Sequence, residues 1–241
     1  MSLQSDPPKL TIPAPKVDKA PRWFGRTMEE LRRDGLPRAW EGEACYIVGG
    51  GPSLKSFDFR RLDGLNVIAI NRAFEDLPGA GLVTFSDARF WRWHGGGEDS
   101  PLYRHSGLKI TVQSHKQVKA PCVLNMTGTG RRGLELRPTR LKHGVSTGYA
   151  AINIAWHLAP NPIVLLGFDG KAGPNGSDHY HDGHPAGTRI GAFGIMNRYY
   201  ASIAAPLIFH GVTVINACPG SAIDCFPKAH IDDAVPAIAF T

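Results

Sequence analysis

Three histidines and two aspartates lie within seven residues of this chain, in the Gly-rich segment around "SDHYHDGHP". The histidines are His179, His181 and His184. Imidazole and carboxylate groups bind zinc and other divalent ions, although this spacing matches no standard structural zinc site. A histidine here can also act as a general base or, when charged, contact a phosphate. We expect a catalytic or phosphate-binding histidine, with a metal site or a polar surface loop as the alternatives.

A run of small residues follows directly on an apolar stretch at 44–48. The run consists of Gly49, Gly50, Gly51, Pro52 and Ser53. Because glycine has no Cβ, the backbone N–H groups of such a loop can approach a phosphate closely. The hydroxyl of Ser53 can cap the next helix or bond an anion. The run fits neither the dinucleotide-binding motif nor the P-loop motif, and it predicts an anion-binding loop, with a plain tight turn as the alternative.

Further polar residues stand where other apolar runs end or where a helix begins. They are Asn71, Asp87 and Asp169 after apolar runs, and Ser146, Thr147 and Gly148 at a predicted helix start. Each signal is weak alone, because turns favour Asn and Asp and helix starts favour Ser and Thr. The loops after parallel strands meet at one edge of a sheet, where ligands collect. Together these residues predict a nucleotide-sized site at that edge.

Seven short β-rich runs alternate with polar loops and helical segments. The runs lie at 44–48, 66–70, 82–86, 109–113, 122–126, 162–167 and 212–217. Several are apolar at consecutive positions, as in parallel strands that are covered on both faces. Helices are predicted at 146–159 and at 189–211, the second kinked or broken near Pro206. A capping box of Thr27 and Glu30 predicts a further helix start.

This alternation predicts a single Rossmann-like α/β domain, with a mostly parallel central sheet flanked by helices, over residues 23–241. Residues 1–22 are rich in Pro, Lys and Asp, so we expect an extended or disordered arm that can mediate homo-oligomer contacts. No apolar run reaches the roughly 18 residues that span a bilayer, and no signal peptide is evident. We therefore expect a cytoplasmic protein without a membrane span.

The formal net charge of +6 favours anionic partners, whether nucleotides, phosphorylated substrates or nucleic acid. The basic stretch at 130–142 is the place to test for nucleic acid, with a solvated loop as the alternative. The cysteines, Cys45, Cys122, Cys218 and Cys225, form no CxxC pair. They are expected to be free and largely buried thiols.

Several stretches resemble the bacterial sialyltransferases that modify lipooligosaccharide. These are "IVGGGPSLKSFD", "LNVIAINRAF", "STGYAAINIAWHL", "PIVLLGFDG" and "VINACPGSAIDCFP". They also resemble the 6-hydroxymethylpterin pyrophosphokinase-like group, and most closely a set of uncharacterised phage and prophage proteins sometimes labelled norphogenetic. The resemblance covers residues 44–228. It implies that the glycine loop, Asn71 and the helix start at 146–148 contact a cytidine monophosphate donor, and that a histidine of 179–184 is the base.

The leading hypothesis is a nucleotide- or nucleotide-sugar-binding transferase of the glycosyltransferase type, encoded by a phage or prophage and acting in the host cytoplasm. No cofactor is obligatory, because backbone amides and helix N-termini can stabilise phosphate charge, although a divalent metal is compatible. One alternative is a metal-dependent pyrophosphokinase or phosphohydrolase that uses Asp87, Asp169 and the histidines. The other is a non-catalytic phage assembly module that binds nucleic acid through its basic face.

Overall fold

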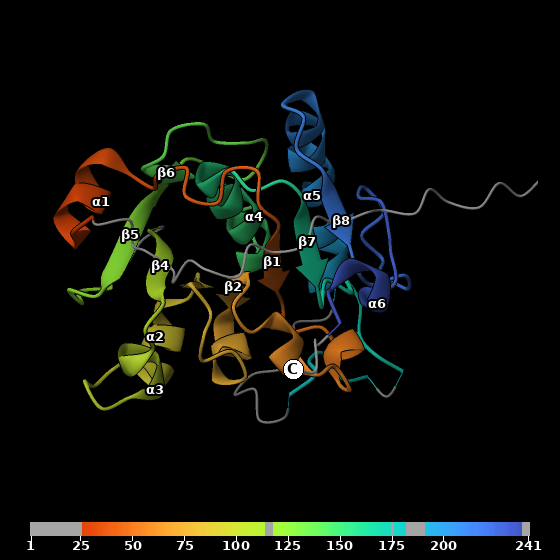
Figure 1. Ribbon diagram of the computed structural model, residues 1–241, viewed down its shortest axis with the longest axis horizontal. Helices are drawn as coiled ribbons and strands as arrows, with labels where there is room; N and C mark the ends of the chain where they lie inside the picture. Colours follow the sequence, from red (N-terminus) through yellow and green to blue (C-terminus); the bar gives the residue numbers. More distant parts are fainter. Residues whose placement is uncertain (1–25, 114–117, 175, 182–190, 238–241) are drawn as a thin grey trace, which may run out of the picture.

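The computed structural model describes residues 26–113, 118–174, 176–181 and 191–237. Within these residues eight strands form one sheet in the order β6-β5-β4-β3-β2-β1-β7-β8 (Figure 1). The strands are β1 Cys45–Val48, β2 Asn66–Ile70, β3 Leu82–Phe85, β4 Leu108–Gln113, β5 Val123–Gly128, β6 Arg140–Leu141, β7 Ile163–Leu166 and β8 Val214–Asn216. Every neighbouring pair is parallel, so the sheet is wholly rather than mostly parallel.

The sheet is buried on both faces, as the consecutive apolar residues of its strands require. All four residues of β1 and all four of β7 are buried. Ile47 pairs with Ile68 of β2 on one side and with Leu165 of β7 on the other. Because side chains alternate along a strand, Ile47 packs in the core layer beneath α4, while Val48 belongs to the layer on the opposite face.

Helices cover both faces of the sheet and confirm the single α/β domain (Figure 1). They are α1 Met28–Asp34, α2 Ala88–His94, α3 Pro101–Arg104, α4 Thr147–Leu158, α5 Ala192–Phe209 and α6 Ile231–Ala234, with 3-10 turns at Pro52–Leu54, Phe59–Leu62 and Asn71–Glu75. The predicted capping box is present, since Thr27 and Glu30 bond each other's backbone N–H at the start of α1. Helix α5 continues through Pro206 instead of breaking. Pro206 has no N–H to donate to the carbonyl oxygen of Ser202, so the helix continues with one bond of its ladder missing.

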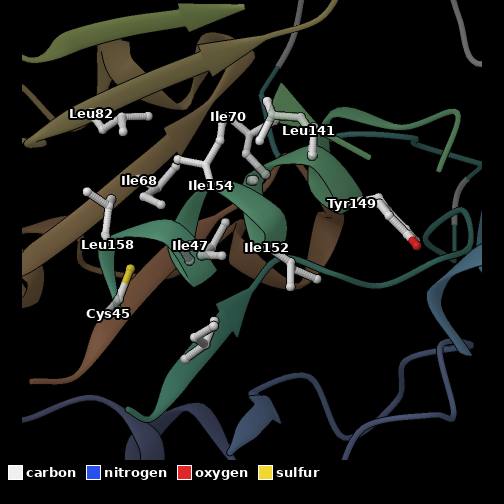
Figure 2. Packing of buried hydrophobic residues seen from close by; sticks show 14 of the residues in the cluster. Cys45, Ile47, Ile68, Ile70, Leu82, Leu141, Tyr149, Ile152, Ile154 and Leu158 are labelled. Atoms are coloured by element: carbon white, nitrogen blue, oxygen red, sulfur yellow. The ribbon is translucent and has the colours of Figure 1, made fainter. Parts of the chain in front are cut away.

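Helix α4 is buried almost all round and lies against the centre of the sheet. Ile152 and Ile154 of α4 are fully buried and pack in the same core layer as Ile47 and Ile68 (Figure 2). Its N-cap is Ser146, whose hydroxyl oxygen accepts a hydrogen bond from the N–H of Tyr149. The helix that begins at this cap is therefore held rigidly by the core.

The basic stretch at 130–142 is clamped onto α4 by one buried amide. The Oδ1 atom of Asn153 accepts hydrogen bonds from the N–H groups of Glu135 (3.0 Å) and Lys142 (2.9 Å). Its Nδ2 atom donates to the carbonyl oxygen of Glu135 at 3.0 Å. Asn153 is fully buried, so these bonds are shielded from water. The stretch also contributes β6, a two-residue strand that the apolar pattern did not predict.

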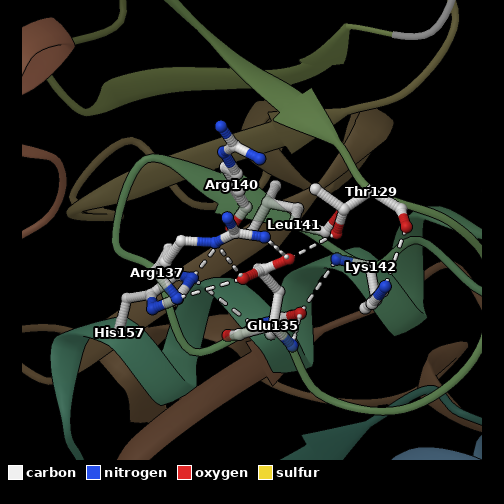
Figure 3. Close-up of polar contacts among 8 residues, drawn as sticks. Thr129, Glu135, Arg137, Arg140, Leu141, Lys142 and His157 are labelled. Carbon is white, nitrogen blue, oxygen red and sulfur yellow. Dashed lines mark hydrogen bonds and ion pairs between the residues drawn. The ribbon is translucent and has the colours of Figure 1, made fainter.

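The buried carboxylate of Glu135 holds the same stretch together (Figure 3). Its Oε1 atom accepts from the Nε atom of Arg137 at 2.9 Å, and its Oε2 atom accepts from the hydroxyl of Thr129 at 2.6 Å. The Arg137 guanidinium, aided by Thr129, lowers the pKa of Glu135 to about 2. The carboxylate is thus charged throughout the physiological pH range and fixes the strand-to-helix connection that leads into α4.

All four cysteines are free thiols, as expected. Cys45 and Cys218 are buried, whereas Cys122 and Cys225 are half-buried. Burial raises the pKa of the Cys45 thiol, which keeps it protonated. Among the helices in the described ranges, none has the length and apolar character needed to cross a bilayer. The predicted arm at 1–22 lies outside the described residues, so its role in oligomer contacts stays a prediction.

Candidate functional site

A cleft of about 310 Å³ opens at the carboxyl ends of β1, β2 and β7. Its walls include Gly49, Gly50 and Gly51 after β1, Asn71 after β2, Ser146, Thr147 and Gly148 at the start of α4, and Asp169 after β7. The chain runs from β1 toward β2 on one side and places β7 on the other. The cleft therefore lies at the topological switch point, where ligands bind in open α/β sheets. These eight residues and His179, all singled out in the sequence, meet here.

Two of the three glycines are required by close packing between the β1 and β7 loops. A Cβ on Gly51 would lie 1.9 Å from Oδ2 of Asp169 and 2.5 Å from the carbonyl oxygen of Gly167. A Cβ on Gly49 would lie 2.9 Å from that same carbonyl. The N–H of Gly51 donates a hydrogen bond to the carbonyl oxygen of Gly167 at 3.0 Å, so the backbones of the two loops are in direct contact. Gly50 instead lies beneath the imidazole of His179, with 3.0 Å between a built Cβ and Nδ1.

Ser53 and Asp169 bond each other across the two loops. The N–H of Ser53 donates to Oδ1 of Asp169 at 3.1 Å, and its hydroxyl donates to Oδ2 at 2.8 Å. Pro52 is the first residue of the 3-10 turn at Pro52–Leu54. Neither Pro52 nor Ser53 lines the cleft. Asp169 does line it, and its carboxylate orders the glycine loop.

The start of α4 forms part of the wall of the cleft. The hydroxyl of Ser146 lies 3.2 Å from that of Tyr200, and the hydroxyl of Thr147 donates to Ser86 at 3.1 Å. Gly148 has no room for a side chain, because a Cβ would lie 2.5 Å from the Tyr200 hydroxyl. Across the part of the chain that the structure describes, no group accepts a hydrogen bond from the N–H of Thr147 or Gly148. Two backbone donors beside the positive end of a helix dipole have the chemistry that suits an anion.

Two residues in the walls of the cleft adopt left-handed backbone conformations. Val145 has φ 58° and Asn71 has φ 50°. Asn tolerates this region, but a β-branched residue does so only under strain. Val145 precedes the N-cap of α4, so the strained turn sets the direction in which the helix N-terminus points. Strain of this kind concentrates at functional sites.

The histidine segment is anchored through Tyr180. The N–H of Tyr180 donates to the carbonyl oxygen of Gly50 at 2.9 Å, and its hydroxyl donates to Oδ2 of Asp76 at 2.8 Å. Burial, with Asp76 adding to it, raises the pKa of Tyr180, so this phenol stays neutral. The rings of His179 and His181 stack with centroids 5.1 Å apart, and His179 lines the cleft. His184 lies outside the described residues.

Asp87 is not brought into the cleft. Its Oδ1 atom accepts from the N–H of Arg89 at 2.8 Å as the N-cap of α2, and Oδ2 forms an ion pair with the Arg89 guanidinium at 2.7 Å. Hydrogen bonds from Arg89 lower the pKa of Asp87. Among the residues that the structure describes, no group of three or more histidine, cysteine or acidic side chains is placed to hold a metal ion. The metal alternative therefore stays a prediction.

Other residues of the cleft were not singled out in the sequence. Lys171, two positions after Asp169, adds a positive charge to the wall. Tyr200 of α5 lies in the wall beside the start of α4, with its hydroxyl 3.2 Å from that of Ser146, and burial raises its pKa to about 12. Lys171 has a sequence signal, since it directly follows a strand-end loop. Tyr200 has none, because it lies on an apolar helix far from any strand end.

No family model matches the sequence, and no curated protein matches it. The fold is similar to the structure described as MAf glycosyltransferase from Magnetospirillum magneticum AMB-1, with a TM-score of 0.51 and 13% sequence identity. The match covers 89% of this chain and 39% of that protein, so the chain spans well under half of its length. The resemblance to sialyltransferases and phage proteins has no sequence-family match and stays a prediction. The chain is therefore a Rossmann-like α/β protein that shares its fold with part of a glycosyltransferase.

Proposed function

We propose that this protein is a glycosyltransferase that binds a nucleotide-activated sugar in the cleft at 49–51, 71 and 146–148. The observation that carries the proposal is the start of α4, where Thr147 and Gly148 line a cleft at the switch point of the sheet and, among the described residues, no group accepts a hydrogen bond from their N–H groups. The fold shared with a glycosyltransferase supports this reaction class. The resemblance of the motifs to sialyltransferases favours a cytidine nucleotide among the donors.

The phosphate of the donor is placed at the start of α4. The helix is 12 residues long, and its positive end and two backbone donors suit a phosphate oxygen. Lys171 adds a positive charge to the wall of the same cleft. Because the start of α4 belongs to a helix that the core holds, its two backbone donors need little rearrangement as charge develops on the leaving phosphate. This arrangement stabilises the leaving group without requiring a metal.

The imidazole of His179 is the base in this proposal. It takes the proton from an acceptor hydroxyl, whose oxygen forms a bond to the anomeric carbon of the donor sugar. The bond between that carbon and the phosphate oxygen breaks, and the nucleotide leaves with the electron pair. The N–H groups of Thr147 and Gly148 stabilise the negative charge on that oxygen. The proton on His179 then passes to solvent or to the departing phosphate.

A pair of variants at Thr147 tests the phosphate site. Thr147→Pro removes one backbone donor but suits the first position of a helix, and Ser146 before it already has the extended conformation that proline requires, with ψ 148°. Thr147→Ala is the matched control, because it loses the hydroxyl bond to Ser86 and keeps the N–H. We expect Thr147→Pro to bind a nucleoside monophosphate about tenfold more weakly than Thr147→Ala, since a bond to a charged group contributes about 1.5 to 3 kcal/mol.

The measurement is titration calorimetry of the folded variants with cytidine, uridine, adenosine and guanosine monophosphates, each with and without Mg²⁺. A nucleotide that binds wild-type protein should, at a concentration of 100 times its dissociation constant, raise the free energy of unfolding by about 2.7 kcal/mol. This increase is visible as a rise in Tm. Equal affinities of the two variants would show that the start of α4 does not hold the phosphate. Absence of binding by every nucleotide would refute the proposed function. Binding that requires Mg²⁺ would instead favour the pyrophosphokinase alternative.

A further inference from the structure

A smaller hollow of about 60 Å³ lies beside the cleft. Its own wall is formed by Arg72, Phe90, Trp93, His94 and His181. It shares Gly50, Ile70, Asn71 and His179 with the cleft, so the two spaces meet at His179. This side pocket is too small to enclose a nucleoside, but it can hold one face of a small ring. Whatever binds there is next to the imidazole proposed as the base.

The side pocket carries an exposed aromatic ring. Trp93 lies on α2 and is 49% exposed, although the Arg89 guanidinium is 5.8 Å from its ring centroid. Phe90, one turn earlier on α2, is buried and packs on Phe85 and Phe74, which fixes the helix that carries Trp93. An indole in this setting offers an apolar surface to a ligand at little cost in conformational entropy.

The polar groups of the side pocket are held in place and balanced in charge. Glu75 accepts hydrogen bonds from Arg72 at 2.7 Å and 3.1 Å, and its Oε1 atom lies 3.5 Å from Nδ1 of His94. One carboxylate thus orients both the guanidinium and the imidazole before any ligand binds. Because the charge of Arg72 is compensated by Glu75, the side pocket suits a neutral, hydroxyl-rich ligand better than a phosphate.

We propose that the side pocket binds one pyranose ring of the acceptor, so that the acceptor is a saccharide. The inference rests on the proposed function, because only in that reaction is the bound sugar the acceptor. Trp93 packs against the C–H face of the sugar ring, while Arg72 and His94 bond its hydroxyls. A hydroxyl at the edge of this acceptor ring then lies against His179, on the side that faces the cleft and the donor phosphate at the start of α4. A ring with one apolar face and several hydroxyls matches a pocket of this composition.

The test measures glycoside and nucleotide binding on the same samples. Full-length wild-type protein is examined by saturation-transfer NMR with the methyl β-glycosides of galactose, glucose and N-acetylglucosamine, and by calorimetry with the four nucleoside monophosphates. Trp93→Ala removes the ring, and Trp93→Phe keeps an aromatic face. Phe209→Ala is the matched control, because Phe209 is 85% exposed and lies 16 residues beyond Phe193 of the cleft wall on the same helix. That spacing is about 24 Å along the axis.

We expect at least one glycoside to bind wild type, Trp93→Phe and Phe209→Ala alike, and Trp93→Ala about tenfold more weakly. Nucleotide affinity should stay within about twofold in all of them. The inference is overturned if no glycoside binds wild type, if Trp93→Ala binds glycosides normally, or if it loses nucleotide affinity instead. If glycosides bind through Trp93 while no nucleotide binds, the saccharide pocket stands and the proposed function fails.

Discussion

Substitution of Glu135 by glutamine tests whether one buried carboxylate stabilises the connection into α4. Glutamine keeps the shape of the side chain but removes the negative charge of the carboxylate, which accepts hydrogen bonds from Arg137 at 2.9 Å and from Thr129 at 2.6 Å. The side chain of Glu135 is only 8% exposed, so water replaces these bonds poorly. We therefore expect Glu135→Gln to lower the free energy of unfolding at neutral pH.

The magnitude follows from the pKa of Glu135, which falls from its ordinary value of 4.5 to about 2 in the folded protein. Each pH unit of difference between the folded and unfolded pKa corresponds to about 1.4 kcal/mol, so the charged group contributes about 3 kcal/mol. Arg137 is 63% exposed, and solvent screening makes this value an upper bound. Because the folded pKa is lowered, the contribution is complete above the unfolded pKa and is lost as the pH falls toward the folded one.

The assay is urea denaturation of wild type and Glu135→Gln at pH 7, 6, 4 and 3. The difference in unfolding free energy should be equal at pH 7 and 6, smaller by about 1 kcal/mol at pH 4, and less than half at pH 3. Glu41→Gln is the control, since Glu41 forms a solvent-exposed ion pair with Arg38 and its loss should change stability little. A difference that stays constant down to pH 3, or that vanishes already at pH 6, would refute the reasoning.

Two further predictions concern the walls of the cleft. Gly51→Ala should destabilise the protein by about 2 kcal/mol or more, because the new Cβ meets Asp169 and Gly167. Gly79→Ala, where nothing lies within 4 Å of the new Cβ, should leave the Tm unchanged or slightly raised, and equal Tm values for the two variants would contradict the packing. Lys171→Met should keep the Tm but weaken the binding of nucleoside monophosphates and make that binding less dependent on salt. Calorimetry at two ionic strengths measures both effects. An unchanged salt dependence would exclude a contact between Lys171 and the phosphate.

The strands and the main helix could be predicted because their signals are local. Consecutive apolar residues at 44–48 and 162–167 indicate strands buried on both faces, and Ser146 marks a helix start. Strand β6 had no such signal. It has two residues, Arg140 and Leu141, and exists because β5 extends far enough to pair with it. Long-range pairing of this kind is invisible to a pattern read along the chain.

The roles of single polar residues depended on partners that sequence spacing does not show. Asp87 and Asp169 both follow strands, so both were predicted for the site. Asp87 pairs with Arg89 two residues away and serves as a local helix cap. Asp169 reaches Ser53, 116 residues earlier, and orders a loop on the neighbouring strand. The same residue type at the same kind of position thus acts locally in one case and across the sheet in the other.

The glycine run shows how a position can be predicted correctly from a reason that is incomplete. Its glycines suggested close approach of a phosphate, but Gly49 and Gly51 are required by the neighbouring β7 loop. The free backbone donors of the cleft come instead from α4, almost a hundred residues later. Both features meet because β1 and β7 are adjacent at the switch point and α4 lies against β1 and β2. A loop that lacks side chains lets the helix N-terminus and the histidine segment approach one space, and it is this convergence that makes the cleft a candidate active site.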